Sequence, residues 1–226
     1  KTIGYALTLR DPSAPSARCR SPFDPVLDLS TFRSTYALRR ASEIAPRDFL
    51  SLALLRQSYE SRGMLEPLRA VDERIMALTP VNPEQKRLMG IAEAATTSVA
   101  QSLAGPIPTS WNNLDELDRL VNHELEIGRV ETAVRLLESA YPPGRASWQG
   151  VDRLSTLLLH LGEPERARKH LQAVVDVPRP ALRDVRLAVC DVVEGRHDEA
   201  RQAFRRAIEA EPGLFDAHYI LAVLEQ

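Results

Sequence analysis

The sequence predicts an all-α protein built from antiparallel pairs of helices. Ala, Leu, Arg and Glu dominate the composition, and all four favour a helical backbone. Only 10 Gly, five Phe and two Trp occur in 226 residues, which argues against a fold rich in strands and turns. Hydrophobic residues make up 44% of the chain, enough for a continuous core. No uninterrupted apolar run approaches the roughly 18 residues that a membrane-spanning helix needs.

A repeated pattern of residues divides most of the chain into units. Ala37–Pro46 aligns without a gap with Ala203–Pro212, and a Phe follows three residues after each of these prolines. Gly128, Gly162 and Gly195 are spaced 34 and 33 residues apart, and each is followed five residues later by an Ala. The Gly supplies a tight turn between two helices, and the small Ala lets the second helix approach the first. Each unit is therefore expected to be a helical hairpin.

The pattern assigns the chain in order from its first residue. Residues 1–28 contain four Pro and are expected to form an extended linker or a strap against the first helices. Residues 29–48 hold half a unit. Units follow at 49–80, 114–145, 148–179 and 181–212, with a degenerate or lengthened unit at 83–111, and 215–226 matches the first helix of one more. We therefore expect a linker over 1–28, divergent N-terminal repeats over 29–112, and a C-terminal array over 113–226 that ends in a half repeat.

Two of the N-terminal units depart from the pattern. In the unit at 49–80, Arg56, Leu68 and Asp72 stand where other residue types recur. The unit at 83–111 keeps Gly90 in its first helix but loses the pattern of its second helix at Gly105–Pro108. Because neighbouring repeats stabilise each other, this interruption is where we expect the array to bend or open.

Small and large apolar residues at fixed places on two antiparallel helices resemble the tetratricopeptide repeat (TPR), a unit of about 34 residues. The resemblance is closest at 181–212 and extends over about 49–226. It implies a right-handed α-α superhelix, a TPR-like solenoid whose first helices line a concave groove. It also implies that a protein or peptide ligand binds in this groove.

Residues three and four apart share one face of a helix, so positions two, five, six, nine and twelve or thirteen of each first helix should line the groove. These positions give the candidate partner-binding residues Asp118, Asn122, Asp152, Arg153, Thr156, His160, Arg186 and Val189. The predicted groove is mixed in charge and becomes apolar toward its C-terminal end. Some TPR proteins hold a peptide's C-terminal carboxylate with five residues, of which only Asn122 and Arg186 match here. Asp118 and Asp152 instead favour an Arg or Lys of the ligand.

The sequence offers no motif for catalysis or metal binding. None of the five His has a second His four residues away, and Ile127 stands where a zinc-protease motif beginning at His123 would need one. Cys190 lies in an apolar helical pattern, whereas Cys19 lies between Arg18 and Arg20, so the two do not suggest a disulfide framework. Cys19 is either a lipidation or redox site or a residue without a role. We expect no enzymatic activity, no metal and no cofactor.

The leading functional prediction is a bacterial, non-catalytic scaffold for protein–protein interaction. The net charge of −2 provides no broad basic field, so nucleic acid is not an expected partner. The alternative is an accessory or regulatory region of a larger membrane-anchored enzyme, secretion protein or envelope assembly protein, which the missing initial Met and the final half repeat favour. A weaker alternative is an enzyme with a pocket around His160, Asp152 and Arg153. We expect self-association through the half repeat, no membrane insertion, and a location in the cytoplasm or in the soluble part of a membrane-anchored or periplasmic protein.

Overall fold

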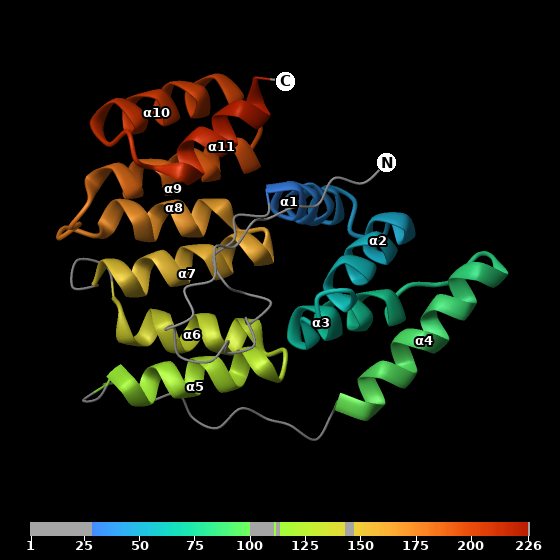
Figure 1. The fold of residues 1–226 in the computed structure, drawn as a ribbon. Coiled ribbons are helices and arrows are strands. Elements are labelled where there is room, and N and C mark those ends of the chain that lie inside the picture. The colour runs from blue at the N-terminus through green and yellow to red at the C-terminus, as the bar shows by residue number, and fades with distance from the viewer. Residues whose placement is uncertain (1–28, 100–110, 112–113, 143–146, 226) are drawn as a thin grey trace, which may run out of the picture.

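The computed structural model describes residues 29–99, 111, 114–142 and 147–225, and all regular structure in these residues is helical (Figure 1). The helices are α1 (Leu29–Ile44), α2 (Phe49–Glu60), α3 (Leu65–Met76), α4 (Pro83–Val99), α5 (Leu114–Glu126), α6 (Val130–Ala140), α7 (Trp148–Leu161), α8 (Pro164–Ala173), α9 (Pro180–Val193), α10 (His197–Ala210) and α11 (Phe215–Leu224). The predicted all-α class of TPR-like helical hairpins is confirmed. The predicted strap at 1–28, Cys19 and the interruption at Gly105–Pro108 lie outside the described residues.

The hairpins form where the repeat pattern predicts them. Helices α2/α3, α5/α6, α7/α8 and α9/α10 are consecutive pairs that pack on each other. Each pair is joined by a glycine in the left-handed region, with φ of 66° at Gly63, 76° at Gly128, 76° at Gly162 and 83° at Gly195. The Ala that follows the glycine by five residues is fully buried at 133, 167 and 200. The predicted register is therefore correct in these hairpins.

The C-terminal hairpins are stacked in one layer after another, from α5/α6 through α7/α8 and α9/α10 to the single helix α11 (Figure 1). Their core is almost entirely aliphatic, with Leu117, Leu154 and Leu158 fully buried and Phe204 as the largest side chain inside. Tyr141 follows α6 and places its ring so close to Gly150 of α7 that a Cβ there would overlap it. Small and large residues thus alternate across the helix contacts.

The N-terminal helices form a second unit in which α1 packs on α2, α2 on α3, and α3 on α4. The two charged residues that depart from the repeat pattern here face each other in its interior. Arg56 Nε donates to Asp72 Oδ1 at 2.7 Å, and the two residues are only 5% and 1% exposed. Burial raises the pKa of Asp72, while the neighbouring Arg56 guanidinium opposes this shift. The two departures therefore compensate each other: an ion pair replaces the apolar contact between α2 and α3.

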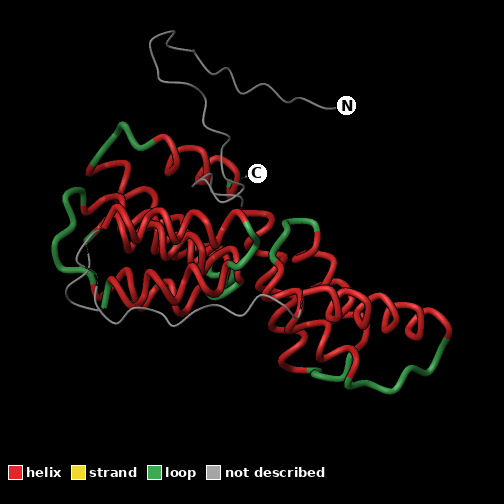
Figure 2. Tube along the Cα trace, turned by 90° about the horizontal axis from the view of Figure 1, so that it is seen from below, coloured by secondary structure: helices red, strands yellow, loops and turns green. Residues whose placement is uncertain are grey.

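The N-terminal unit lies beside the C-terminal stack, across the hairpin turns at one end of its helices (Figures 1 and 2). Leu65 N at the start of α3 donates to Gly128 O at 2.8 Å, in the turn between α5 and α6. Glu66 accepts from Thr132 N at 2.8 Å in the first turn of α6. Helix α1 packs against α7 and α9, and its Tyr36 donates to Glu165 at 3.2 Å. The two units thus meet end-on, and the chain does not continue as one uniform stack.

Side chains of the N-terminal unit also cap the C-terminal end of α7. Arg62 Nη1 donates to His160 O at 2.9 Å, and Tyr59 Oη donates to Leu161 O at 3.3 Å. Arg39 of α1 forms an ion pair with Glu163 at 2.7 Å. The last carbonyl groups of a helix have no partner in their own helix and carry partial negative charge, so these donors stabilise α7 and join the two units.

We predict that Gly128→Ala destabilises the chain more than Gly195→Ala. Both glycines have positive φ, so an Ala at either costs about 1–2 kcal/mol of backbone strain. A Cβ at Gly128 would additionally overlap Gly63 O across the contact between the units, whereas nothing lies within 4 Å of a Cβ at Gly195. Urea unfolding followed by circular dichroism should therefore show a larger loss for Gly128→Ala. Equal losses would contradict the close contact at this turn.

We predict that Asp72→Leu alone destabilises the chain by about 3–5 kcal/mol, because it leaves a buried guanidinium without its main partner. Combining it with Arg56→Met should recover most of this loss, since an apolar pair of similar volume replaces the whole ion pair. The free energies of unfolding of the parent, both single variants and the double variant form the required cycle. A double variant as unstable as the sum of the single variants would show that the two residues do not act as a pair.

Candidate functional site

The predicted groove residues on α5 and α7 contact each other. Arg153 Nη1 donates to Asp118 Oδ1 at 3.1 Å, and its Nη2 donates to Asn122 Oδ1 at 2.6 Å. Burial lowers the pKa of Arg153, and the Asp118 carboxylate opposes this shift. The Asp118 side chain remains 60% exposed. These three residues therefore link two consecutive first helices, and Asp118 remains accessible from solvent.

A second set of contacts continues along the same side of the stack. Arg186 Nε on α9 donates to Asp152 Oδ1 on α7 at 2.5 Å. The other side of this guanidinium lies 3.7 Å from Asp216 of α11, whose side chain is half exposed. Because Arg186 is buried, this ion pair holds α7 and α9 together and leaves little of the guanidinium exposed to a ligand.

The other three predicted groove residues lie in the interior. Val189 is fully buried, and Thr156 donates its hydroxyl to Asp152 O of its own helix at 3.0 Å. His160 is buried beside Phe32 of α1, with the two rings edge to face at 4.8 Å. Helix α1 packs against both α7 and α9, and its Arg39 pairs with Glu163 just after the end of α7. These three side chains are not available to a partner in this structure.

The position of α1 was not predicted from the sequence. The repeat pattern puts the half unit at 29–48 before the array, and nothing in it indicates that this helix lies against α7 and α9. Phe32, fully buried, is the residue of α1 that lies against His160.

We predict that Asp152→Ala destabilises the chain by about 1–3 kcal/mol, because it leaves the buried Arg186 guanidinium without a close partner. Asp118→Ala should change stability by at most about 0.5 kcal/mol, because its ion pair with Arg153 is exposed to solvent. Thermal unfolding of the two variants compares the buried and the exposed pair directly. If Asp118→Ala proved the more damaging change, the assignment of the two pairs would be wrong.

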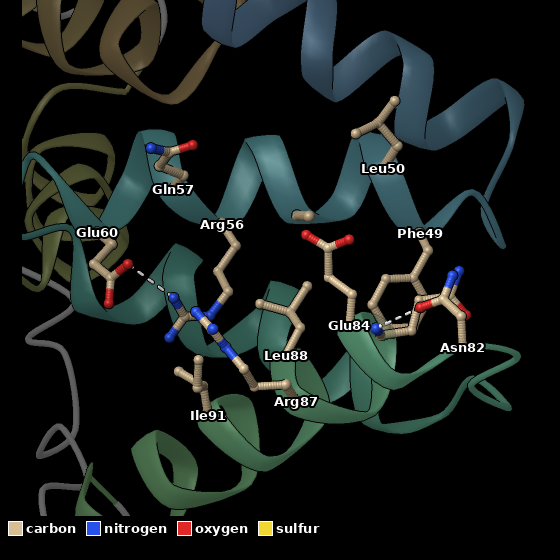
Figure 3. Close-up of a pocket in the computed structure, with 12 residues that line it drawn as sticks. Phe49, Leu50, Arg56, Gln57, Glu60, Asn82, Glu84, Arg87, Leu88 and Ile91 are labelled. Carbon is tan, nitrogen blue, oxygen red and sulfur yellow. Dashed lines mark hydrogen bonds and ion pairs between the residues drawn. The ribbon is translucent and has the colours of Figure 1, made fainter.

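A cleft opens between α2 and α4 in the N-terminal unit, with a volume of about 490 Å³ (Figure 3). Its apolar lining is Phe49, Leu50, Ala53, Leu88 and Ile91, and its polar lining is Arg56, Gln57, Glu60, Asn82, Glu84, Gln85 and Arg87. Most of these residues occupy groove positions of their units in the predicted register. The cleft is therefore the part of the concave face that lies between the first helices of the units at 49–80 and 83–111.

The walls of the cleft are held by local contacts. Asp48 caps α2 by accepting from Ser51 N at 3.0 Å, and its hydrogen bonds from Ser51 lower the pKa of Asp48. Asn82 caps α4 by accepting from Gln85 N at 2.8 Å, and Pro83 follows at the first helical position, where its missing N–H costs nothing. Leu50 is nevertheless 66% exposed and Ile91 40% exposed. Fixed helices thus present aliphatic side chains to solvent.

The α11 half repeat also leaves aromatic side chains exposed. Phe215 and Tyr219 stack on one side of α11, with ring centroids 6.3 Å apart, and are 77% and 57% exposed. Helix α11 packs on α10. Self-association through this helix stays a prediction.

Cys190 is buried, and burial raises the pKa of its thiol to about 12, so the thiolate that a nucleophile requires is not populated near neutral pH. No group of His, Cys, Asp or Glu in the described ranges could hold a metal ion. None of the helices in the described part of the chain combines the length and apolar character that crossing a bilayer requires.

Comparisons with known proteins bear on the fold of the chain. No protein-family model matches the sequence, and no curated protein matches it. Among solved structures, the chain is similar to a thermophilic TPR protein of Thermus thermophilus, with 19% sequence identity and a TM-score of 0.36 over 84% of this chain and 88% of that chain. A TM-score of this size reflects only partial superposition, so the assignment of TPR-like hairpins rests on the helices and turns of the chain itself.

Proposed function

We propose that this chain is a non-catalytic scaffold that binds a segment of another protein in the cleft between α2 and α4. The observation that carries this proposal is the exposure of Leu50 and Ile91 on opposite walls of a formed cleft. Aliphatic side chains that remain exposed together on rigid elements are typical of interaction surfaces. A volume of about 490 Å³ lies within the usual range for ligand sites.

A comparison between the two parts of the concave face supports the cleft between α2 and α4 as the binding site. On α7 and α9 the predicted positions are taken up by the ion pair between Asp152 and Arg186 and by the packing of α1. On α2 and α4 the corresponding positions line an open cleft. A ligand at α7 and α9 would have to break existing contacts, whereas a ligand in the cleft would cover surface that is exposed.

The experiment is a selection of peptides on the folded chain from a random phage-displayed library. Peptides that bind the parent chain should bind Ala53→Trp at least about tenfold more weakly, because the indole fills the cleft. The matched control is Ala70→Trp, which adds the same side chain at an exposed position of α3 that does not line the cleft. Asp118→Ala should leave affinity unchanged, and loss of binding in that variant alone would place the site on α5 and α7 instead.

A further inference from the structure

Two guanidinium groups enter the cleft from its opposite walls. Arg56 extends from α2 and Arg87 from α4, and both point into the same end of the cleft (Figure 3). Arg56 is already matched by acidic partners, since its Nε donates to Asp72 at 2.7 Å and its Nη1 donates to Glu60 at 2.8 Å. Arg87 has no hydrogen-bond or ion-pair partner within the described part of the chain. Arg87 is therefore the cation in this cleft that is free to bind a ligand.

The charge of the cleft is unequal along its length. Glu84 extends from the same helix as Arg87 and points toward α2, away from the two guanidinium groups (Figure 3). Ile91 follows Arg87 by four residues on α4 and so lies on the same face of the helix, and Leu88 also lines the cleft, so aliphatic surface adjoins the guanidinium. One end of the cleft thus offers a cation beside apolar surface, and the other end offers an anion.

We propose that the ligand of this cleft is a segment of a partner protein that carries an acidic side chain between aliphatic side chains. The acidic group pairs with Arg87, which can bind a carboxylate through two parallel N–H donors. The aliphatic side chains cover Leu50, Leu88 and Ile91. This inference rests on the proposed function, because it specifies the chemistry of a ligand in the same cleft.

The test uses two synthetic peptides that are acetylated and amidated, so that terminal charges take no part. In one peptide Leu residues flank a Glu, and in the other the Glu is replaced by Lys. The parent chain should bind the Glu peptide on the order of tenfold more tightly, as measured by fluorescence anisotropy. Arg87→Glu should reverse this preference, because it replaces the free cation of the cleft by an anion.

Lys86→Glu is the matched control for Arg87→Glu. Lys86 is the adjacent residue of α4, it is exposed, and it does not line the cleft, so its reversal changes the net charge by the same amount. This variant should keep the preference for the Glu peptide. If both reversals weakened the Glu peptide equally, long-range charge and not a contact in the cleft would explain the preference, and the inference would be overturned.

The remaining outcomes separate the inference from the proposed function. Equal binding of both peptides, lost in Ala53→Trp, would overturn the acidic ligand and leave the apolar cleft as the binding site. Binding of both peptides unchanged in Ala53→Trp would overturn both proposals. Self-association of the chain that Ala53→Trp abolishes would assign the cleft to a second copy of the chain, and it would overturn a partner segment as the occupant.

Discussion

The C-terminal end of α7 is the point on which the arrangement of the whole chain depends. Its last carbonyl groups accept hydrogen bonds from Arg62 and Tyr59 of the N-terminal unit. These contacts bring α1 against α7 and α9, where Phe32 lies against His160. The carbonyl groups at this helix end, which would otherwise bind water, thus join the N-terminal and C-terminal units. The joint determines which part of the concave face stays open.

The two parts of the concave face have opposite properties for this reason. On α5, α7 and α9, charged side chains such as Arg153 and Arg186 pair between the first helices of successive hairpins, and α1 packs against α7 and α9. On α2 and α4, the aliphatic side chains Leu50 and Ile91 are left exposed and Arg87 has room for a ligand. Equivalent positions of the repeat therefore hold helices together in the C-terminal unit, and we infer that they bind a ligand in the N-terminal unit.

The buried pair of Arg56 and Asp72 connects the stability of the N-terminal unit with the shape of its cleft. Arg56 stands where the next unit has Gly90, so a long side chain replaces a small one beside α4. Asp72 holds the guanidinium through its carboxylate, and Arg56 lines the cleft. A buried ion pair adds little net stability over an apolar pair of similar volume. The departures from the repeat pattern thus contribute to the lining of the cleft and are not a loss of the fold.

The sequence by itself determined the hairpins, their glycine turns and their register, because each depends on residues close together in the chain. Gly195, for example, lies in the turn between α9 and α10, and Ala200 lies five residues later in α10. Their spacing is sufficient to predict the left-handed turn and the burial of Ala200. Most of the predicted groove residues, among them Asp118 and Arg153, lie on one side of the stack. Only the tertiary structure decided that these residues pair with each other and that α1 lies against α7. The reason is physical: these contacts join residues far apart in the sequence, and some of their acceptors are backbone carbonyl groups, which every residue possesses, so the local repeat pattern does not reveal them.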